Sequence, residues 1–293
     1  MEFRLTDDQL ALRTGFRALL DGRFGRDELR AAVERPVIDR ALWRELGDAG
    51  LFSLRLPEAD GGVGLGLPEA VLVFEEAGRA LLPGPLIATH LAAGTVPGAD
   101  TGRTVVAASD GALVEWLAEA DEVVGEAGDA RPVRSVDPLT PLHRVSGERA
   151  DRPAAALLTA ALQLGSAART TELAVQYAKE REQFGRPIGA FQAVKHLCAR
   201  MLVRTELARV AVYAAAVTAE GGDGVRAPDT DVAGAKLLAD DAAVRNARDC
   251  IQVHGGMGFT WESDVHLHLK RAWVRANQWI TEAEAEELIA AAL

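Results

Sequence analysis

The sequence predicts a mostly α-helical protein with a small β segment in its middle. In the N-terminal part of the chain and again after residue 150, apolar residues recur at the spacing of one helix face. Between residues 100 and 150 the chain consists of short, valine-containing runs separated by Gly, Asp and Pro, a pattern typical of strands. We therefore expect an N-terminal helical domain at 1–98, a short β domain at 99–149 and a C-terminal helical bundle at 150–293.

Start and stop signals locate the N-terminal helices. Thr6 followed by Gln9 has the spacing of a capping box, in which two side chains satisfy free backbone N–H groups. The apolar positions after it recur at helical spacing: Leu12, Phe16, Leu19 and Leu20. A second helix is expected around 41–50 and a third over 68–82, where Pro68 suits the first turn and a Pro-Gly-Pro sequence ends the helix. The stretch DGGVGLGLP between them predicts a flexible loop.

Long helices with buried faces are expected after residue 151. The first two carry apolar positions that share one side: Leu157, Ala161, Leu164, Ala168 and Val175, then Val194, Cys198, Met201, Thr205 and Ala208. The sequence GGDGVRAPD at 221–229 separates them from a third, capped by Asp229 or Thr230 and ended by Gly255-Gly256. Its buried side is expected to carry Val232, Ala235, Ala239, Ala242 and Val253. A last helix over WESDVHLHLKRAWVRANQW and the segment EAEAEELIAAAL complete the chain, and the alanine content suits close packing in a bundle.

The bulk composition is that of an ordinary globular protein. A net charge of -11 argues against broad binding to nucleic acid, because the phosphates would be repelled. No apolar run approaches the roughly 20 residues that span a bilayer, and the acidic, amphipathic N-terminus is unlike a secretory signal. We expect a soluble, cytoplasmic protein. Cys198 and Cys250 lie inside apolar helical patterns and are interpreted as isolated buried thiols, with no disulfide and no metal site expected.

The stretch REQFGRPIGAFQ at 181–192 lies between two predicted helices and carries side chains suited to a nucleotide. Arg181 can fork two hydrogen bonds to a phosphate. Phe184 offers a flat apolar face, and the amide of Gln192 can donate and accept hydrogen bonds. The alternative is a loop that only packs two helices, with Arg181 paired to an acid. Residue chemistry alone leaves both interpretations open.

A second polar motif, QVHGGMGFTWE, occupies residues 252–262. Two adjacent glycines after a helix let backbone amides come close to a ligand, and Gln252 and His254 flank that approach. A glycine helix stop is the plainer interpretation, and this motif taken alone is weak evidence for a site.

Together and in this order, ERxQFGRPIGxFQxxKH and QVHGGxGFTWExD strongly resemble the acyl-CoA dehydrogenase family of flavoproteins. The resemblance covers about residues 150–280 and extends loosely to the N-terminal helices, where Gly61-Gly62 lies in a similar loop. It implies an N-terminal helical domain, a middle β domain and a C-terminal four-helix bundle. It also implies FAD as cofactor and an acyl-CoA as substrate.

The resemblance implies FAD contacts for both motifs. In the family the first motif touches the FAD of a neighbouring subunit, which here implies roles for Arg181, Phe184 and Gln192, with Gln183 and Ile188 nearby. The second motif lines the ADP portion of the same FAD. The corresponding residues here are Gln252, Gly255 and Gly256, with His254 beside them.

Two departures from the family concern catalysis. The family base is a glutamate, since a carboxylate in an apolar pocket gains basicity. In register, Trp279 stands at its position; in members that carry the base near the start of the helix after the β domain, the matching residue is Ala155. Neither can take a proton, so we assign no catalytic residue. The β domain is about half the family length, lacks a CxTEPxAGSD-like segment and is interpreted as truncated.

These departures suggest a division of labour between unlike subunits. The chain resembles the short subunit of actinobacterial heteromeric acyl-CoA dehydrogenases that serve steroid side-chain breakdown. We expect it to work as an oxidoreductase only within a heteromer such as a heterotetramer, where a homologous full-length subunit supplies the glutamate and the intact β domain. Two alternatives stay open: a homo-oligomeric enzyme of the same fold with diverted or flavin-independent biosynthetic chemistry, and a non-catalytic scaffold.

Other polar residues have plainer interpretations. His266 and His268 are two positions apart, so on a helix they face different sides and are expected to be structural. Glu262 beside Trp261 is a minor candidate for a stray base. The acidic run near the end is expected to be a solvated helix face: Glu282, Glu284, Glu286 and Glu287.

Overall fold

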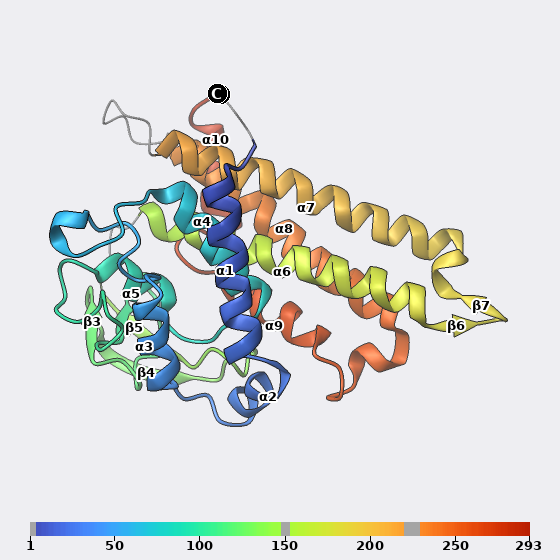
Figure 1. Ribbon diagram of the computed structural model, residues 1–293, viewed down its shortest axis with the longest axis horizontal. Coiled ribbons are helices and arrows are strands. Elements are labelled where there is room, and N and C mark those ends of the chain that lie inside the picture. The colour runs from blue at the N-terminus through green and yellow to red at the C-terminus, as the bar shows by residue number, and fades with distance from the viewer. Residues whose placement is uncertain (1–3, 148–152, 220–228) are drawn as a thin grey trace.

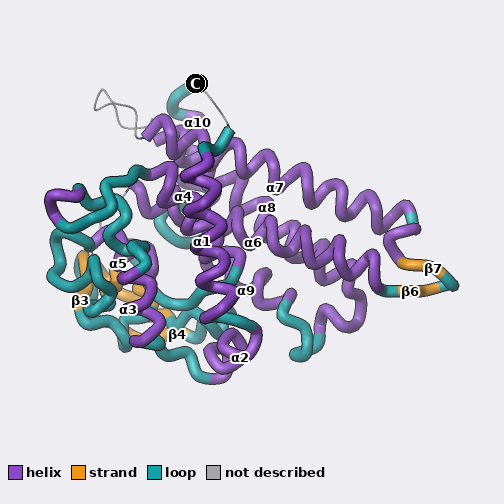
Figure 2. Tube along the Cα trace, in the orientation of Figure 1, coloured by secondary structure: helices purple, strands orange, loops and turns teal. Residues whose placement is uncertain are grey.

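The structure is a computed structural model that describes residues 4–147, 153–219 and 229–293. Helices make up most of it, and along the chain β1–β5 come between the two helical parts, which confirms the predicted mostly α-helical fold (Figure 2). The N-terminal helices are α1 (Asp7–Arg23), α2 (Arg26–Glu34), α3 (Arg40–Asp48), α4 (Leu67–Arg79) and α5 (Leu86–Ala92), with the 3-10 turn η1 (Glu58–Asp60). The strands that follow are β1 (Val106–Ala108), β2 (Leu113–Glu115), β3 (Glu122–Val124), β4 (Gly128–Val133) and β5 (Leu142–Ser146).

The C-terminal part begins with the long helix α6 (Figure 1). Its elements are α6 (Pro153–Glu180), β6 (Glu182–Gln183), β7 (Arg186–Pro187), η2 (Ile188–Ala190), α7 (Gln192–Ala219), α8 (Asp229–His254), η3 (Gly255–Phe259), α9 (Val265–Arg275) and α10 (Glu282–Ala290). None of the described helices combines the length and the apolar character that a bilayer span requires.

The N-terminal helices begin at the predicted signals. The Thr6 side chain accepts from the Gln9 N–H at 3.2 Å, and the Gln9 side chain accepts from the Thr6 N–H at 3.0 Å, so the capping box is formed. α3 and α4 lie where the second and third helices were predicted. α2 and α5 were not predicted. α2 is rich in charge and buries only Leu29, which gives it a weak apolar period, although Glu28 caps the N–H of Gly25 at 3.0 Å.

The β segment consists of two very small sheets. β1 and β3 pair in parallel, and β2, β5 and β4 form an antiparallel sheet in that order. The inner faces bury Ala107, Val114 and Val145 in a cluster of their own. These strands confirm the expectation of a few short strands in this part of the chain.

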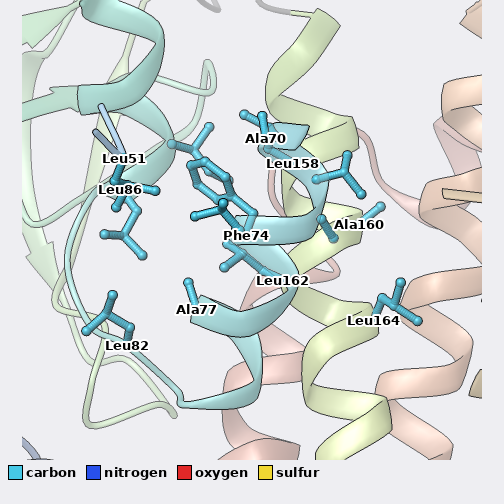
Figure 3. Packing of buried hydrophobic residues seen from close by; sticks show 14 of the residues in the cluster. Leu51, Ala70, Phe74, Ala77, Leu82, Leu86, Leu158, Ala160, Leu162 and Leu164 are labelled. Carbon is cyan, nitrogen blue, oxygen red and sulfur yellow. The ribbon is translucent and has the colours of Figure 1, made fainter. Parts of the chain in front are cut away.

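α4 crosses α6 so closely that backbone touches backbone. A Cβ on Gly165 of α6 would lie 1.8 Å from the carbonyl oxygen of Glu75, a contact that no real side chain tolerates. Glycine is therefore required at this crossing. Beside it, Phe74 of α4 and Leu158 and Leu164 of α6 are fully buried in the main apolar core (Figure 3). The crossing fixes the N-terminal helices on the C-terminal bundle.

One buried arginine ties three parts of the fold together. Arg271 of α9 donates to the carboxylate of Asp137 at 2.7 Å, to the carbonyl of Leu82 after α4 at 3.0 Å and to the carbonyl of Leu139 before β5 at 3.0 Å. Its side chain is 3% exposed and that of Asp137 is 0% exposed. Each buried charge thus has a partner, without which its burial would be costly.

The long helices α6, α7 and α8 pack along one another (Figure 1). Most predicted core positions of these helices are buried, including Leu157 and Met201 and all five predicted on α8. The proposed cap of α8 was wrong: Asp229 and Thr230 lie inside its first turn, because the helix has already begun at Asp229. The residue before it lies outside the described residues, and so does the break predicted at 221–229, except for Asp229.

Candidate functional site

The stretch that follows α6 forms a small hairpin at the end of the bundle. β6 and β7 pair in antiparallel fashion and project beyond α6 and α7, at the end of the molecule opposite the β1–β5 strands (Figure 1). The hairpin is anchored at its base, where the Arg181 N–H donates to the Tyr177 carbonyl at 2.8 Å and the Ile188 N–H donates to the Arg181 carbonyl at 2.7 Å. Ile188 also packs, half-buried, against an apolar cluster between the helix ends.

The hairpin presents its side chains to solvent. Phe184 is 90% exposed and has a left-handed backbone with φ +54°, a conformation that costs a bulky residue on the order of 1–3 kcal/mol. Its ring meets the edge of Phe191 with 6.0 Å between centroids. Arg181, Gln183 and Gln192 are exposed as well. A large aromatic ring held in water by a strained turn indicates a contact surface rather than a packing element.

The guanidinium of Arg181 has no acidic partner in the described part of the chain. By contrast, Arg23 and Arg40 are each 2.5 Å from a carboxylate. The ion pair that the alternative interpretation requires, between Arg181 and an acid, is therefore absent from the described residues. An unpaired guanidinium keeps its fork of donors available for a phosphate or a carboxylate.

The second motif lies at the end of α8. The helix ends at His254, and Gly255 has φ +59°, the left-handed geometry predicted for this stop. A Cβ placed on Gly255 or Gly256 would meet no atom within 4 Å, so the space beside this backbone is open. Gln252 on the last turn is exposed. The backbone at this turn is therefore accessible to a ligand at close range.

An aromatic contact joins the two motifs. The ring of His254 stacks on Tyr177 of α6 with 4.1 Å between centroids and 22° between planes. The Nδ1–H of His254 donates to the Cys250 carbonyl at 2.8 Å, and burial lowers the pKa of the ring, which keeps it neutral at pH 7. No sequence pattern predicted this role for Tyr177, because its partner lies on a different helix. The stack places the end of α8 beside the base of the hairpin.

The positions at which a base was sought hold no carboxylate. Ala155 is fully buried in the core, and Trp279, with φ +65°, packs half-buried against it. Trp279 and Gln278 line a cavity of about 10 Å³ against β1 and β2. That is no more than the space one water molecule needs. Trp279 thus helps to close the region where the resemblance places a catalytic glutamate.

Glu115 on β2 is a carboxylate at this small cavity, and sequence reasoning missed it. Although part of the residue reaches solvent, desolvation raises its pKa, and a hydrogen bond from Gln278 Nε2 to its Oε2 at 3.0 Å lowers the pKa in part. No local sequence pattern identifies Glu115, because its partner Gln278 lies far away along the chain and comes close only in the folded structure. The cavity itself, at about 10 Å³, is too small to hold an acyl thioester.

α7 carries an apolar face that no described residue covers. Its inner side packs into the core through Met201, Ala208 and Val212, while large apolar side chains on its outer side are 43–62% exposed: Leu202, Val203, Leu207, Val210 and Val217. Four of them recur at helical spacing and form one stripe. A contiguous exposed apolar stripe of this kind indicates a surface that pairs with another protein.

The remaining candidates have structural surroundings. His268 is buried beside Ser166, and His266 meets the edge of Trp261 with 4.8 Å between centroids, so the two histidines face different neighbours, as predicted. The backbone carbonyl of Glu262 accepts from Arg26 at 2.7 Å. Cys198 and Cys250 are free, and the described residues contain no group of three His, Cys, Asp or Glu side chains that could hold a metal. The acidic residues of α10 are exposed, as expected.

Two family models match the chain. The model described as acyl-CoA dehydrogenase, N-terminal domain, matches residues 6–103, and the model described as acyl-CoA dehydrogenase, C-terminal domain, matches residues 154–280. Acyl-CoA dehydrogenase IpdE2 of Mycobacterium tuberculosis is 35% identical over 307 residues, which cover 91% of each protein. Acyl-CoA dehydrogenase FadE34 of the same organism is 38% identical over 87% of this chain, which spans only 42% of that longer protein.

Solved structures share the fold over nearly the whole chain. A variant of the Tcur3481-Tcur3483 steroid ACAD has a TM-score of 0.83 and 25% identity, covering 97% of both chains. The ChsE4-ChsE5 complex from Mycobacterium tuberculosis also gives 0.83, with 24% identity over 100% of this chain and 98% of the other. Butyryl-CoA dehydrogenase from Megasphaera elsdenii gives 0.86, with 20% identity over 100% of this chain and 99% of the other.

Proposed function

Because this chain belongs to the acyl-CoA dehydrogenase family, whose members are oxidoreductases acting on acyl-CoA, we propose that it is one subunit of an FAD-dependent enzyme for α,β-dehydrogenation of an acyl-CoA thioester. In this proposal the chain lends the ADP half of the flavin site to a homologous full-length subunit, and that partner supplies the catalytic glutamate. One contrast carries the proposal. The side chains of the hairpin are exposed, and the Arg181 guanidinium has no acidic partner among the described residues. Beside Trp279, by contrast, the cavity measures only about 10 Å³.

The proposed flavin contacts follow from what each exposed group can bind. Arg181 would hold the pyrophosphate through charge-assisted hydrogen bonds, and Phe184 would lie against a flat ring. Gly255 and Gly256 would let backbone N–H groups approach the ADP portion. The amides of Gln183, Gln192 and Gln252 would add directional hydrogen bonds. When bound, FAD supplies the hydride acceptor for the dehydrogenation.

Ile188 and His254 have supporting roles in this proposal. Ile188 sits on the apolar cluster beneath the hairpin and donates its N–H to the Arg181 carbonyl, so it fixes the base from which Arg181 projects. His254 is held by Tyr177 and by the Cys250 carbonyl, so it fixes the turn at Gly255. Both residues hold the hairpin and the glycine turn at fixed positions relative to each other, which is required if the two are to bind one ligand together.

The partner in the proposal is a homologous subunit whose helical bundle covers the outer face of α7. The stripe of Val203, Leu207 and Val210 is 56–62% exposed on this chain, and pairing with a similar apolar helix would remove it from water. Two of the similar structures bear paired names, the ChsE4-ChsE5 complex and Tcur3481-Tcur3483, and these support an unlike partner. The steroid ACAD among them supports a steroid side-chain CoA as the acyl substrate.

In this proposal the partner brings the base, because neither of the two family positions and no described carboxylate beside them offers one in a usable place. The base removes a proton from the carbon next to the thioester carbonyl. It must therefore be a carboxylate within hydrogen-bond reach of that proton, about 2.6–3.2 Å between heavy atoms, or reach it through one water molecule. Ala155 and Trp279 cannot accept a proton, and Glu115 faces a cavity of about 10 Å³. If a separate subunit provides an intact substrate pocket and the base, the hairpin of this chain can still contribute to catalysis by binding FAD.

The proposal is tested by turnover. The chain is expressed alone and together with a full-length homologue from the same genome, and acyl-CoA oxidation is measured with an artificial electron acceptor. We expect activity only in the pair, and its loss when the catalytic glutamate of the homologue is changed to glutamine. Activity of the chain alone would contradict the proposal and favour a homo-oligomeric enzyme. A stable pair whose activity does not depend on this chain would favour a scaffold.

A further inference from the structure

A cavity of about 430 Å³ lies among α1, α2, α4, α6 and α9. It shares no lining residue with the hairpin, the end of α8 or the small cavity at Trp279. Its volume falls within the range of about 300–1,000 Å³ that is typical of small-molecule sites. The function proposed above uses none of the residues that line this cavity.

Part of the cavity lining is apolar. Leu20 and Phe24 from the end of α1, Leu29 from α2 and Leu81 after α4 line it, and each is at most 9% exposed. These side chains come from separate elements and belong to the main apolar core. They offer a short hydrocarbon chain a surface on which it can leave water.

The lining also carries more positive than negative charge. Arg17 pairs with Glu76 at 2.6 Å, Arg26 with Asp264 at 2.9 Å, and Arg79 and Arg169 both reach Glu172, at 2.5 and 3.4 Å. Arg30 pairs with Asp264 as well. The charged residues that line the cavity are four arginines, Arg17, Arg26, Arg79 and Arg169, and three carboxylates, Glu76, Asp264 and the exposed Asp21, so the lining has an excess of one positive charge. Arg169 has the longest of these contacts and is the least compensated.

A buried imidazole lines the same wall. His268 is 4% exposed, and its Nδ1 lies 2.8 Å from the Ser166 hydroxyl. Its Nε2 has no hydrogen-bond partner among the residues that the structure describes. Burial and the nearby arginines, Arg169 first among them, lower the pKa of His268 to about 3, so the ring is neutral at pH 7. If Ser166 donates to Nδ1, the proton of the neutral ring is on Nε2, the nitrogen left without a partner.

We propose that this cavity binds a small organic anion, a carboxylate on a short apolar chain. The carboxylate accepts from Arg169 and from Nε2–H of His268, and the chain lies against Leu20 and Phe24. Three observations converge on this ligand: a cavity of suitable size, a lining that combines a positive excess with apolar side chains, and an imidazole nitrogen, His268 Nε2, without a hydrogen-bond partner among the described residues. The site is independent of the flavin contacts proposed above.

The test is calorimetric titration of the full chain with hexanoate at pH 7, with uncharged hexanamide as the comparison ligand. We expect one hexanoate per chain with a dissociation constant between about 10 μM and 1 mM, and affinity for hexanamide at least about tenfold weaker. The variant Arg169→Gln should bind hexanoate at least about tenfold more weakly, since it loses a charge-assisted hydrogen bond. Its side chain is 37% exposed, so the fold should tolerate the change.

Arg245→Gln is the matched control, because Arg245 is 63% exposed on α8, pairs with Asp241 and does not line the cavity. It should bind hexanoate like the wild type. Equal affinity for hexanoate and hexanamide, equal binding by wild type and Arg169→Gln, or no heat of binding up to about 10 mM ligand would each overturn the proposal. If hexanoate affinity falls in Arg169→Gln but not in Arg245→Gln, the binding site is this cavity and not an acyl-CoA site in a co-purified partner.

Discussion

Changing Arg181 to glutamine removes the one cation of the hairpin that is expected to reach the flavin pyrophosphate. A hydrogen bond to a charged group contributes about 1.5–3 kcal/mol. Since each ~1.4 kcal/mol is a factor of ten, Arg181→Gln should raise the dissociation constant of FAD in the assembled enzyme by about 10–150-fold. Arg181 is exposed and has no acidic partner in the described chain, so the free energy of unfolding should change by less than about 0.5 kcal/mol.

The assay is release of FAD from the assembled enzyme on dilution, followed by the recovery of free-flavin fluorescence, beside a urea unfolding curve of the isolated chain. Arg44→Gln is the matched control, because Arg44 is also an exposed arginine, lies on α3 and belongs to neither motif. It should leave FAD affinity unchanged. If Arg181→Gln keeps FAD affinity within about twofold of wild type, the assignment of Arg181 to the pyrophosphate is refuted. If it lowers chain stability by more than about 1 kcal/mol, Arg181 is a structural residue instead.

Further predictions concern stability, assembly and catalysis. Arg271→Ala leaves the Asp137 carboxylate buried without its cation and should lower the free energy of unfolding by about 3–5 kcal/mol in a urea unfolding curve. A loss under about 1 kcal/mol would contradict the role of Arg271 in joining three parts of the fold. His90 is buried, with its pKa lowered from 6.5 to about 4, so the unfolded chain binds the proton first. Stability should therefore fall as pH drops from about 6.5 to 4, and His90→Gln should flatten that dependence by up to one proton. Val210→Glu on the exposed face of α7 should abolish assembly in size-exclusion chromatography, whereas Leu10→Glu, on an exposed position of α1, should not. Glu115→Gln should leave turnover of the assembled enzyme within about twofold, and a loss of about 100-fold or more would identify Glu115 as a base.

Local patterns were sufficient to predict the elements whose core faces are long. α1, α4 and the bundle helices have apolar positions at regular spacing, and the capping box at Thr6 and the stop at Gly255 are readable within a few residues. α2 and α5 escaped because the first buries a single leucine and the second follows a Pro-Gly-Pro stop and is held by contacts with distant segments such as β1. Their stability comes from packing rather than from their own sequence pattern.

The candidate site was predictable only in part. The exposed residues of the hairpin and the glycine turn lie in two continuous motifs, so the sequence identified them. The Tyr177–His254 stack, the contact of Gln278 with Glu115 and the charge excess around Arg169 join residues that are far apart along the chain. Such contacts depend on how helices cross, for which no short pattern exists, and the close approach at Gly165 is an example.

The flavin-to-chain ratio tests the central claim most directly. The chain is purified alone and as a complex with its full-length homologue, and bound FAD is measured from flavin absorbance after denaturation. The account predicts flavin near zero for the isolated chain, because a hairpin that supplies only half of a site cannot retain the cofactor, and stoichiometric flavin in the complex. One FAD per isolated chain, retained through gel filtration, would contradict it.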